Sequence, residues 1–306
     1  MRPVYVSGVI SVSDISLIPL PGPFGVEVRG VNIAAGLESV DFSALASALM
    51  THKVLLLRDQ RLTTQAYAEF ARAWGPTRID GFTEMNVPGF EDVSTVGNTG
   101  HLLDQDAYRN GASFWHTDCA AEPDPNATTM LYCIHAPARD GETVIADMQA
   151  AYDALDPATR REIADLLAYH CYSGTREVLG GRETWEHELV PVTEQTKSQI
   201  PSGALRPIVR RHSVTGRKGL YSPAGSMVSI DGMAASESHR LMRKLKLHAI
   251  DQRFCYRHRY RVNDLLMWDN TATMHYATPI GHATSDDERR LLYRIVPLGL
   301  PSALSV

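Results

Sequence analysis

The chain has 306 residues, of which 44% are hydrophobic and 21% are charged, so it can bury a full hydrophobic core. A formal net charge of −5 and a pI near 6.2 predict no basic surface for nucleic acid. No stretch approaches the roughly 18 apolar residues of a membrane span, and no cleavage-site pattern follows a basic start. We therefore expect a cytoplasmic protein that binds neither nucleic acid nor a membrane.

The first half of the chain mixes predicted strands and helices. Apolar patterns predict a strand region at 25–33, a helix of about ten residues from Asp41, a buried strand at 54–57 and a helix at 63–74. Gly75 and Pro76 end the second helix. Residues 78–113 are rich in Gly, Asn and Asp and contain one convincing strand, at 93–96. We expect a long loop there, of the kind that often forms a functional lid.

Predicted strands dominate the second half. They lie at 128–134, 143–146, 254–260, 264–268 and 291–298, and a hairpin is expected from 206–212 and 219–222. One helix opens at Asp156-Pro157 with apolar positions up to Leu167, and a basic amphipathic helix covers 236–250. Since this order is not a repeating βαβ pattern, the predicted fold class is α+β.

The segment Phe114-Trp115-His116-Thr117-Asp118 carries the first chemical signal. On a strand, side chains at i and i+2 share a face, so His116 and Asp118 can reach one metal ion. His275, which follows a buried-looking strand and a turn, is the best third ligand, although His258 and other histidines compete. Two His and one carboxylate form the facial triad of non-haem Fe(II) oxygenases, and zinc can use the same three ligands.

Further motifs accompany this segment and carry a resemblance to a known family. They are Trp115-His116-Thr117-Asp118, Gly141-Glu142-Thr143, Met267-Trp268-Asp269-Asn270 followed by His275, and Arg289-Arg290-Leu291-Leu292-Tyr293-Arg294. In this order the chain resembles the taurine dioxygenase/2,4-dichlorophenoxyacetate dioxygenase (TauD/TfdA) family of Fe(II)/2-oxoglutarate oxygenases. The likeness spans about 45–298. It implies a double-stranded β-helix (jelly roll) with flanking helices, and we expect one such domain across 1–306.

The resemblance also implies how the cofactor and cosubstrate are held. His116, Asp118 and His275 match the Fe(II) ligands, while Arg290 and Thr143 match the residues that bind the distal carboxylate of 2-oxoglutarate. A planar guanidinium can donate two parallel hydrogen bonds to a carboxylate. The gap between His275 and Arg290 is longer than the family commonly shows, so Arg289 is an alternative to Arg290. On a strand, Arg290 and Arg294 share one face and Arg289 points the other way.

Four residues are predicted to contact the substrate or the cosubstrate. Arg294 matches the position that meets a substrate anion in family members with small acidic substrates. Asp80 is a carboxylate near the position where the taurine enzyme has a histidine, and it could bind an amine. Asn98 is a candidate polar contact to 2-oxoglutarate or substrate, and Trp115 a candidate wall residue. Together they predict a small, anionic, carboxylate-bearing or amino-acid-like substrate.

The leading hypothesis is an enzyme that uses Fe(II), 2-oxoglutarate and O₂ to oxidise a C–H bond of that substrate, giving succinate and CO₂. Two alternatives stay open at this point. One is a non-catalytic jelly-roll protein that binds a metal or an oxoacid, and the other is a zinc-dependent hydrolase on the same ligands. We also expect a homo-oligomer.

Overall fold

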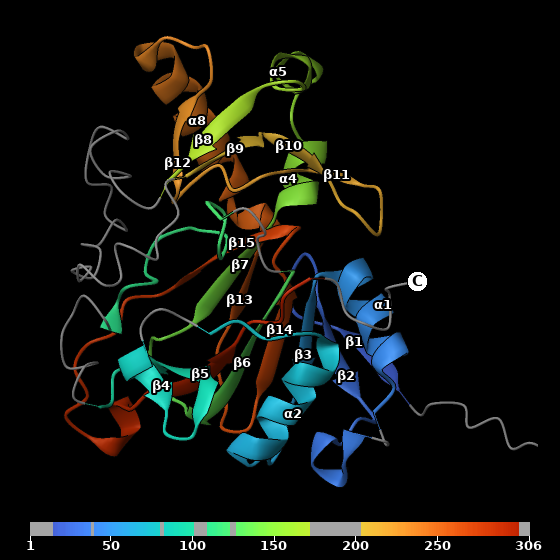
Figure 1. Cartoon of the computed structure of the whole chain (residues 1–306), viewed down its shortest axis with the longest axis vertical. Helices are drawn as coiled ribbons and strands as arrows, with labels where there is room; N and C mark the ends of the chain where they lie inside the picture. Colours follow the sequence, from blue (N-terminus) through green and yellow to red (C-terminus); the bar gives the residue numbers. More distant parts are fainter. Residues whose placement is uncertain are drawn as a thin grey trace, which may run out of the picture.

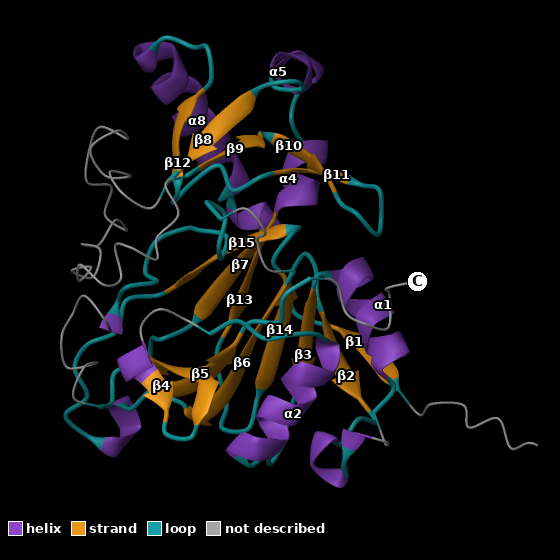
Figure 2. Ribbon diagram, in the orientation of Figure 1, coloured by secondary structure: helices purple, strands orange, loops and turns teal. Residues whose placement is uncertain are grey.

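Two sheets face each other at the centre of the molecule (Figures 1 and 2). The computed structural model describes residues 15–37, 40–79, 83–100, 109–122, 127–171 and 203–299. The eight-stranded major sheet has the order β1 (Ser16–Pro19), β2 (Val26–Arg29), β3 (Val54–Leu57), β14 (Leu265–Asp269), β6 (Thr128–His135), β16 (Leu291–Ile295), β5 (Phe90–Gly97) and β4 (Asn86–Val87). The minor sheet has the order β13 (Cys255–His258), β7 (Thr143–Asp147) and β15 (Thr273–Ala277). This arrangement confirms the predicted α+β jelly roll.

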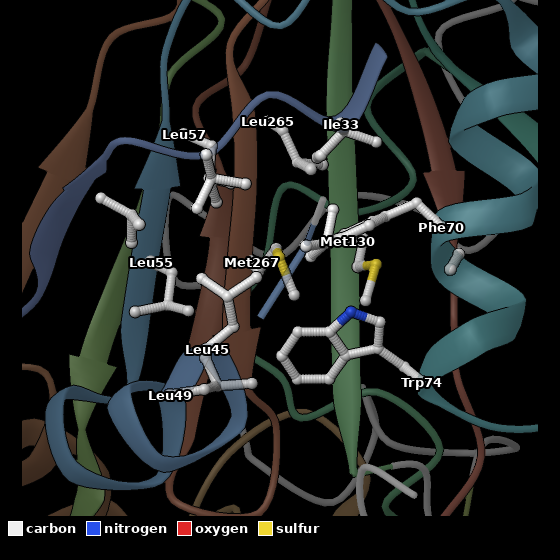
Figure 3. Packing of buried hydrophobic residues seen from close by; sticks show 14 of the residues in the cluster. Ile33, Leu45, Leu49, Leu55, Leu57, Phe70, Trp74, Met130, Leu265 and Met267 are labelled. Atoms are coloured by element: carbon white, nitrogen blue, oxygen red, sulfur yellow. The ribbon is translucent and has the colours of Figure 1, made fainter. Parts of the chain in front are cut away.

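The outer face of the major sheet is covered by α1 (Phe42–His52) and α2 (Thr64–Trp74) (Figure 3). Each helix begins at a polar cap, because the side chains of Asp41 and Thr63 accept hydrogen bonds from Ala44 N and Ala66 N at 2.9 and 3.1 Å. Leu55 of β3 turns outward into this layer and is fully buried there. Alternate residues of the same strands therefore remain free to face the minor sheet.

The outer face of the minor sheet packs against α4 (Met148–Asp153) and α8 (Ala235–Ala249). A three-stranded sheet of β12 (Met227–Ile230), β8 (Leu167–His170) and β9 (Ala204–Pro207) lies beyond them. The predicted hairpin is present as β10 (Val209–Arg211) and β11 (Lys218–Leu220). Short 3-10 helices complete the described elements: η1 (Ile33–Ala35), η3 (Thr83–Met85), η4 (Gln252–Phe254) and η5 (Asp286–Glu288).

One predicted helix is wrong in its length. α5 (Pro157–Glu162) begins at the Asp156 cap, as expected, but it stops before the apolar positions that extended the prediction. Leu167 instead opens β8, where it pairs with Pro207 of β9. Pairing with a distant strand outweighs the helical spacing of Ile163, Leu166 and Leu167.

A third apolar cluster lies between the two sheets. Leu56 and Leu266 come from the major sheet, Ile145 and Tyr256 from the minor sheet, and Tyr260 from just beyond β13. Buried polar side chains share this interior, among them Thr143 and Arg290. Among the described residues, no helix is both long and apolar enough to cross a membrane.

Candidate functional site

His116 and His275 meet across an antiparallel bridge that joins the segment before β6 to β15. His116 N donates to His275 O at 2.9 Å, and His275 N donates to His116 O at 2.8 Å. The bridge places the two imidazole centroids 4.2 Å apart. One ligand atom from each of His116, Asp118 and His275 lies within 4.8 Å of the others. The structure thus brings the three predicted metal ligands together.

Neighbouring groups orient two of these ligands. His116 Nδ1 lies 2.7 Å from Phe114 O, which requires a proton on Nδ1 and leaves the Nε2 lone pair for a metal. Asn270 binds the backbone of Asp118 on both sides, donating to its carbonyl at 2.9 Å and accepting from its N–H at 3.1 Å. Thr129 donates to Asp118 Oδ2 at 2.7 Å. These contacts fix the carboxylate, and the roles of Thr129 and Asn270 were not predicted from the sequence.

The electrostatic environment sets the protonation states that a divalent metal requires. Burial opposes ionisation of Asp118, but the Arg294 guanidinium, 3.2 Å away, outweighs it and holds the pKa of that carboxyl well below its usual value. Burial, followed by the nearby His116, lowers the pKa of His275 to about 3. At neutral pH the cluster therefore contains a carboxylate and a neutral His275.

The three ligands line a cavity of about 240 Å³ between the two sheets. Its apolar lining is Met85, Val96, Ala112, Leu131, Trp268 and Ala277. Its other lining residues include Ser94, Arg109, Thr143, Arg290 and Arg294. One cavity thus combines the three candidate metal ligands, cationic side chains and an apolar wall, which is the usual composition of a small-molecule site.

Of the cationic residues in the described part of the chain, Arg290 is the most deeply buried. It is 1% exposed, its Nε has no hydrogen-bond partner, and no carboxylate of the described residues forms an ion pair with it. Its backbone is clamped by Asn98, whose Oδ1 accepts from Arg290 N at 2.7 Å and whose N donates to Arg290 O at 3.0 Å. A Cβ on Gly141, where φ is +67°, would lie 2.7 Å from Arg290 Cδ. The site is thus built around a buried guanidinium that no carboxylate of the described residues neutralises.

Arg289, the alternative to Arg290, lies on the other side of the chain. Its side chain is 51% exposed and forms an ion pair with Asp286 at 3.1 Å. Arg290 and Arg294 both line the cavity, in agreement with the strand alternation predicted for them.

The family model for the taurine catabolism dioxygenase TauD, TfdA family matches residues 16–296. The chain belongs to this family. The alpha-ketoglutarate-dependent 2,4-dichlorophenoxyacetate dioxygenase of Cupriavidus pinatubonensis (strain JMP 134 / LMG 1197) is 30% identical over 268 residues, which cover 84% of this chain and 90% of that protein. The alpha-ketoglutarate-dependent sulfate ester dioxygenase of Pseudomonas putida is 31% identical over 302 residues, covering 95% and 94%.

The solved structures similar to this TauD/TfdA chain include AAD-2 in complex with Mn(II) and N-oxalylglycine. It aligns with a TM-score of 0.73 at 29% identity, covering 93% of this chain and 97% of AAD-2. A taurine dioxygenase from Burkholderia xenovorans aligns with a TM-score of 0.72 at 25% identity, covering 93% of this chain and 89% of that one. The jelly-roll prediction is confirmed by these neighbours.

As a TauD/TfdA enzyme, the chain is a 2-oxoglutarate-dependent dioxygenase that acts on a small molecule with Fe(II), 2-oxoglutarate and O₂. The side chains present fit these groups. Two imidazoles and one carboxylate converge, a set of donors that suits Fe(II), and the same cavity is lined by the buried Arg290 guanidinium, for which the described residues offer no ion-pair partner. The two alternatives, a non-catalytic binding protein and a zinc hydrolase, are not supported.

The remaining predicted residues divide between the cavity and other places. Thr143 lines the cavity, and its Oγ1 lies 2.8 Å from the hydroxyl of Tyr260, a residue that the prediction did not include. Arg294 lines the cavity and forms an ion pair with Asp118. Asp80 lies outside the described residues.

Two predicted contacts lie elsewhere. Trp115 packs in the hydrophobic cluster under α4 and α8, with its ring centroid 4.6 Å from that of Tyr276, because it alternates with His116 and faces the opposite way. Asn98 Nδ2 donates to the carbonyl oxygens of Gly281 and Glu288 at 2.9 and 2.8 Å. Its amide therefore fixes the chain around Arg290, in place of the direct ligand contact that was predicted.

Proposed function

We propose that His116, Asp118 and His275 hold Fe(II), and that Arg290 and Thr143 bind the distal carboxylate of 2-oxoglutarate. The observation that carries this proposal is the buried Arg290, which has no ion-pair partner in the described part of the chain and lines the same cavity as His116, Asp118 and His275. A buried charge without a partner is costly, so its retention is explained by an anion that binds there. Burial lowers the pKa of Arg290 from its usual value, but a guanidinium remains protonated at neutral pH.

The chemistry divides between the bound groups and the protein. When bound, Fe(II) and 2-oxoglutarate supply O₂ activation that oxidises a substrate C–H bond, with release of succinate and CO₂. The residues of this chain hold and orient the reactants. Asn270 and Thr129 keep the Asp118 carboxylate in place, and the apolar wall formed by Leu131 and Trp268 excludes water from the cavity.

For the primary substrate we propose a small anion with an apolar body. Arg294 offers a charge to the anion, and Met85 and Ala112 offer apolar surface in the same cavity. In support, relatives are named for 2,4-dichlorophenoxyacetate and for sulfate esters. Asp80, the residue predicted to bind a substrate amine, lies outside the described residues, so the amino-acid-like substrate stays a prediction.

An assay for succinate tests the reaction. The panel consists of carboxylates, sulfonates, sulfate esters and amino-acid derivatives. For a true substrate, we expect the amount consumed to equal the amount of succinate formed. We expect this turnover only when both Fe(II) and 2-oxoglutarate are present. Turnover of such a compound without 2-oxoglutarate would contradict the proposal.

A comparison of acids with their neutral derivatives tests Arg294. A methyl ester or an amide carries no negative charge for Arg294 to bind, so we expect kcat/KM for these derivatives to fall by at least about tenfold, or roughly 1.4 kcal/mol. The Arg294→Gln variant should show a much smaller preference for the acid. If the parent enzyme turned over esters as well as acids, Arg294 would have no part in substrate recognition.

Three further expectations concern the whole protein. We propose a single domain over 1–306, which the family match to 16–296 supports. The homo-oligomer and the cytoplasmic location stay predictions. Light scattering coupled to size-exclusion chromatography measures the first, and cell fractionation the second.

A further inference from the structure

Two hydroxyl groups lie behind Arg290 and face each other in the interior. Thr143 Oγ1 and the Tyr260 hydroxyl are 2.8 Å apart, and both residues are almost fully buried, with exposures of 2% and 5%. β7 pairs with β13 so that Thr143 lies opposite His258, and Tyr260 follows two residues later. The guanidinium carbon of Arg290 lies 5.8 Å from the centre of the Tyr260 ring. The hydroxyl pair thus adjoins the proposed carboxylate site.

The Tyr260 phenol stays protonated throughout the ordinary pH range, so it can donate a hydrogen bond. Burial raises the pKa of its phenol well above the usual value, although the nearby Arg290 opposes that shift. Among the described residues, Thr143 is the hydrogen-bond partner of the Tyr260 hydroxyl. Each hydroxyl has a single proton, so only one of the two can donate along the line that joins them.

The direction of that hydrogen bond decides what Thr143 presents to a carboxylate. If Thr143 donates to Tyr260, its oxygen turns only lone pairs toward the cavity, and a carboxylate, which only accepts, gains nothing from it. If Tyr260 donates to Thr143, the Thr143 hydrogen is free to point at the carboxylate. A chain of two hydrogen bonds in one direction is also cooperative.

We infer that Tyr260 is a positioning residue for the cosubstrate: it donates to Thr143 Oγ1 and so directs the Thr143 hydroxyl to the distal carboxylate of 2-oxoglutarate. This inference rests on the proposed function of Arg290 and Thr143. It adds a basis for cosubstrate selectivity, because the oriented hydroxyl favours a 2-oxo acid with a second carboxylate over one that ends in a methyl group.

The test replaces Tyr260 by Phe, which keeps the ring beside Arg290 and removes only the hydroxyl. The readout is equilibrium binding to the Mn(II)-loaded enzyme, measured by calorimetry, for 2-oxoglutarate and for 2-oxopentanoate, which has the same length but lacks the distal carboxylate. We expect Tyr260→Phe to weaken 2-oxoglutarate binding by about three- to tenfold. Binding of 2-oxopentanoate should change by less than about twofold.

A matched control is available on the same side of the interior. Tyr256 is buried in the same apolar cluster, and its hydroxyl bonds to His258 Nδ1 at 3.0 Å. We expect Tyr256→Phe to leave the affinity for both oxo acids unchanged. An equal loss of both affinities in Tyr260→Phe would show a merely structural role and overturn the inference.

A double-mutant cycle tests whether Tyr260 acts through Thr143. In a Thr143→Val background, Tyr260→Phe should cause no further loss of 2-oxoglutarate affinity, whereas additive losses would overturn the inference. Thr143→Ser, which keeps the hydroxyl, should bind 2-oxoglutarate about as well as the parent. Arg290→Lys, measured in parallel, distinguishes a failure of the proposed cosubstrate site from a failure of the role inferred for Tyr260. If Arg290→Lys binds 2-oxoglutarate as well as the parent, the proposed cosubstrate site itself is wrong. If Arg290→Lys and Thr143→Val both bind 2-oxoglutarate weakly while Tyr260→Phe binds it normally, only the role of Tyr260 is wrong.

Discussion

The outer and inner faces of the major sheet come from the same strands and both bury apolar side chains, but the polar side chains of the site lie on the inner face. On β16, Tyr293 and Ile295 turn outward into the apolar layer under α1 and α2, while Arg294 turns inward and lines the cavity. On β6, Met130 turns outward, whereas Thr129 turns inward and donates to Asp118. On these strands, alternation places apolar side chains on the outer face and the polar side chains of the site on the inner face, beside the apolar cluster that includes Leu56 and Leu266.

The two faces of the major sheet contribute to different properties: the outer face mainly to the stability of the fold, and the polar part of the inner face to ligand binding. Apolar burial on the outer face stabilises the fold by about 25 cal/mol per Å². On the inner face, the buried Arg290 guanidinium, which has no ion-pair partner among the described residues, costs free energy until an anion binds to it. Substitutions on the two faces should therefore have opposite consequences, and each prediction below breaks or sharpens that contrast.

The largest effect is expected on the inner face, at the metal ligands. Alanine at His116, Asp118 or His275 should abolish turnover and weaken Mn(II) binding by at least about 100-fold, because each loss leaves only two protein ligands. Far-UV circular dichroism should stay close to that of the parent, since these side chains lie at the cavity. Mn(II) affinity equal to the parent's in any of the three variants would show that the residue is not a ligand.

On the outer face the loss should appear in stability alone. Leu55 is fully buried against α1 and α2, so Leu55→Ala should lower the free energy of unfolding by about 2–5 kcal/mol, measured by urea denaturation. Mn(II) affinity should not change. Leu17→Ala, at a position that is 40% exposed, is the matched control and should leave both quantities unaltered. A loss of Mn(II) affinity in folded Leu55→Ala would break the contrast between the faces.

The next prediction concerns the charge buried on the inner face. Arg290→Lys keeps the charge but removes the planar fork, so the Michaelis constant for 2-oxoglutarate should rise by more than about tenfold, or roughly 1.4 kcal/mol. Arg289→Lys is the control, because Arg289 is half exposed and pairs with Asp286. The reverse pattern, with a large effect only for Arg289→Lys, would move the role to Arg289.

The same position should show the opposite effect on stability. Without ligands, Arg290→Met removes a buried guanidinium that has no ion-pair partner among the residues the structure describes, and it keeps a long apolar side chain, so the free energy of unfolding should rise by about 1–3 kcal/mol. Thermal unfolding of the metal-free protein measures this. A lower melting temperature in Arg290→Met would show that Arg290 stabilises the fold by itself.

Local sequence patterns predicted those elements whose burial follows from their own residues. The strand at 54–57 is an unbroken apolar run, and it matches β3 because both of its faces are buried. β15 was not predicted, since Thr273–Ala277 becomes a strand only through its pairing with β7, which lies far away in the sequence. The helix predicted from Asp156 was too long for the same reason, because Leu167 pairs with Pro207 of β9. Pairing between distant segments leaves no local signal.

The candidate site was predictable to the extent that its residues lie in recognisable motifs. The spacing of His116 and Asp118 and the resemblance of Arg290 to a family position named residues that the structure brings into one cavity. Asn98 was given the wrong contact, because the loop carbonyls that engage its amide are distant in sequence. Tyr260 was overlooked for a similar reason: its hydroxyl has meaning only beside Thr143.

The bridge between His116 and His275 has a consequence for how the protein is made. Each of these residues donates a backbone hydrogen bond to the other, yet the ribosome delivers them at well-separated times. Closing the long intervening chain carries an entropic cost that precedes any gain from the contact. Nascent chains that end before β15 lack one imidazole and the strand that supports the other. If these residues hold the iron, as we propose, the metal site can form only late in biosynthesis, after β15 has been made.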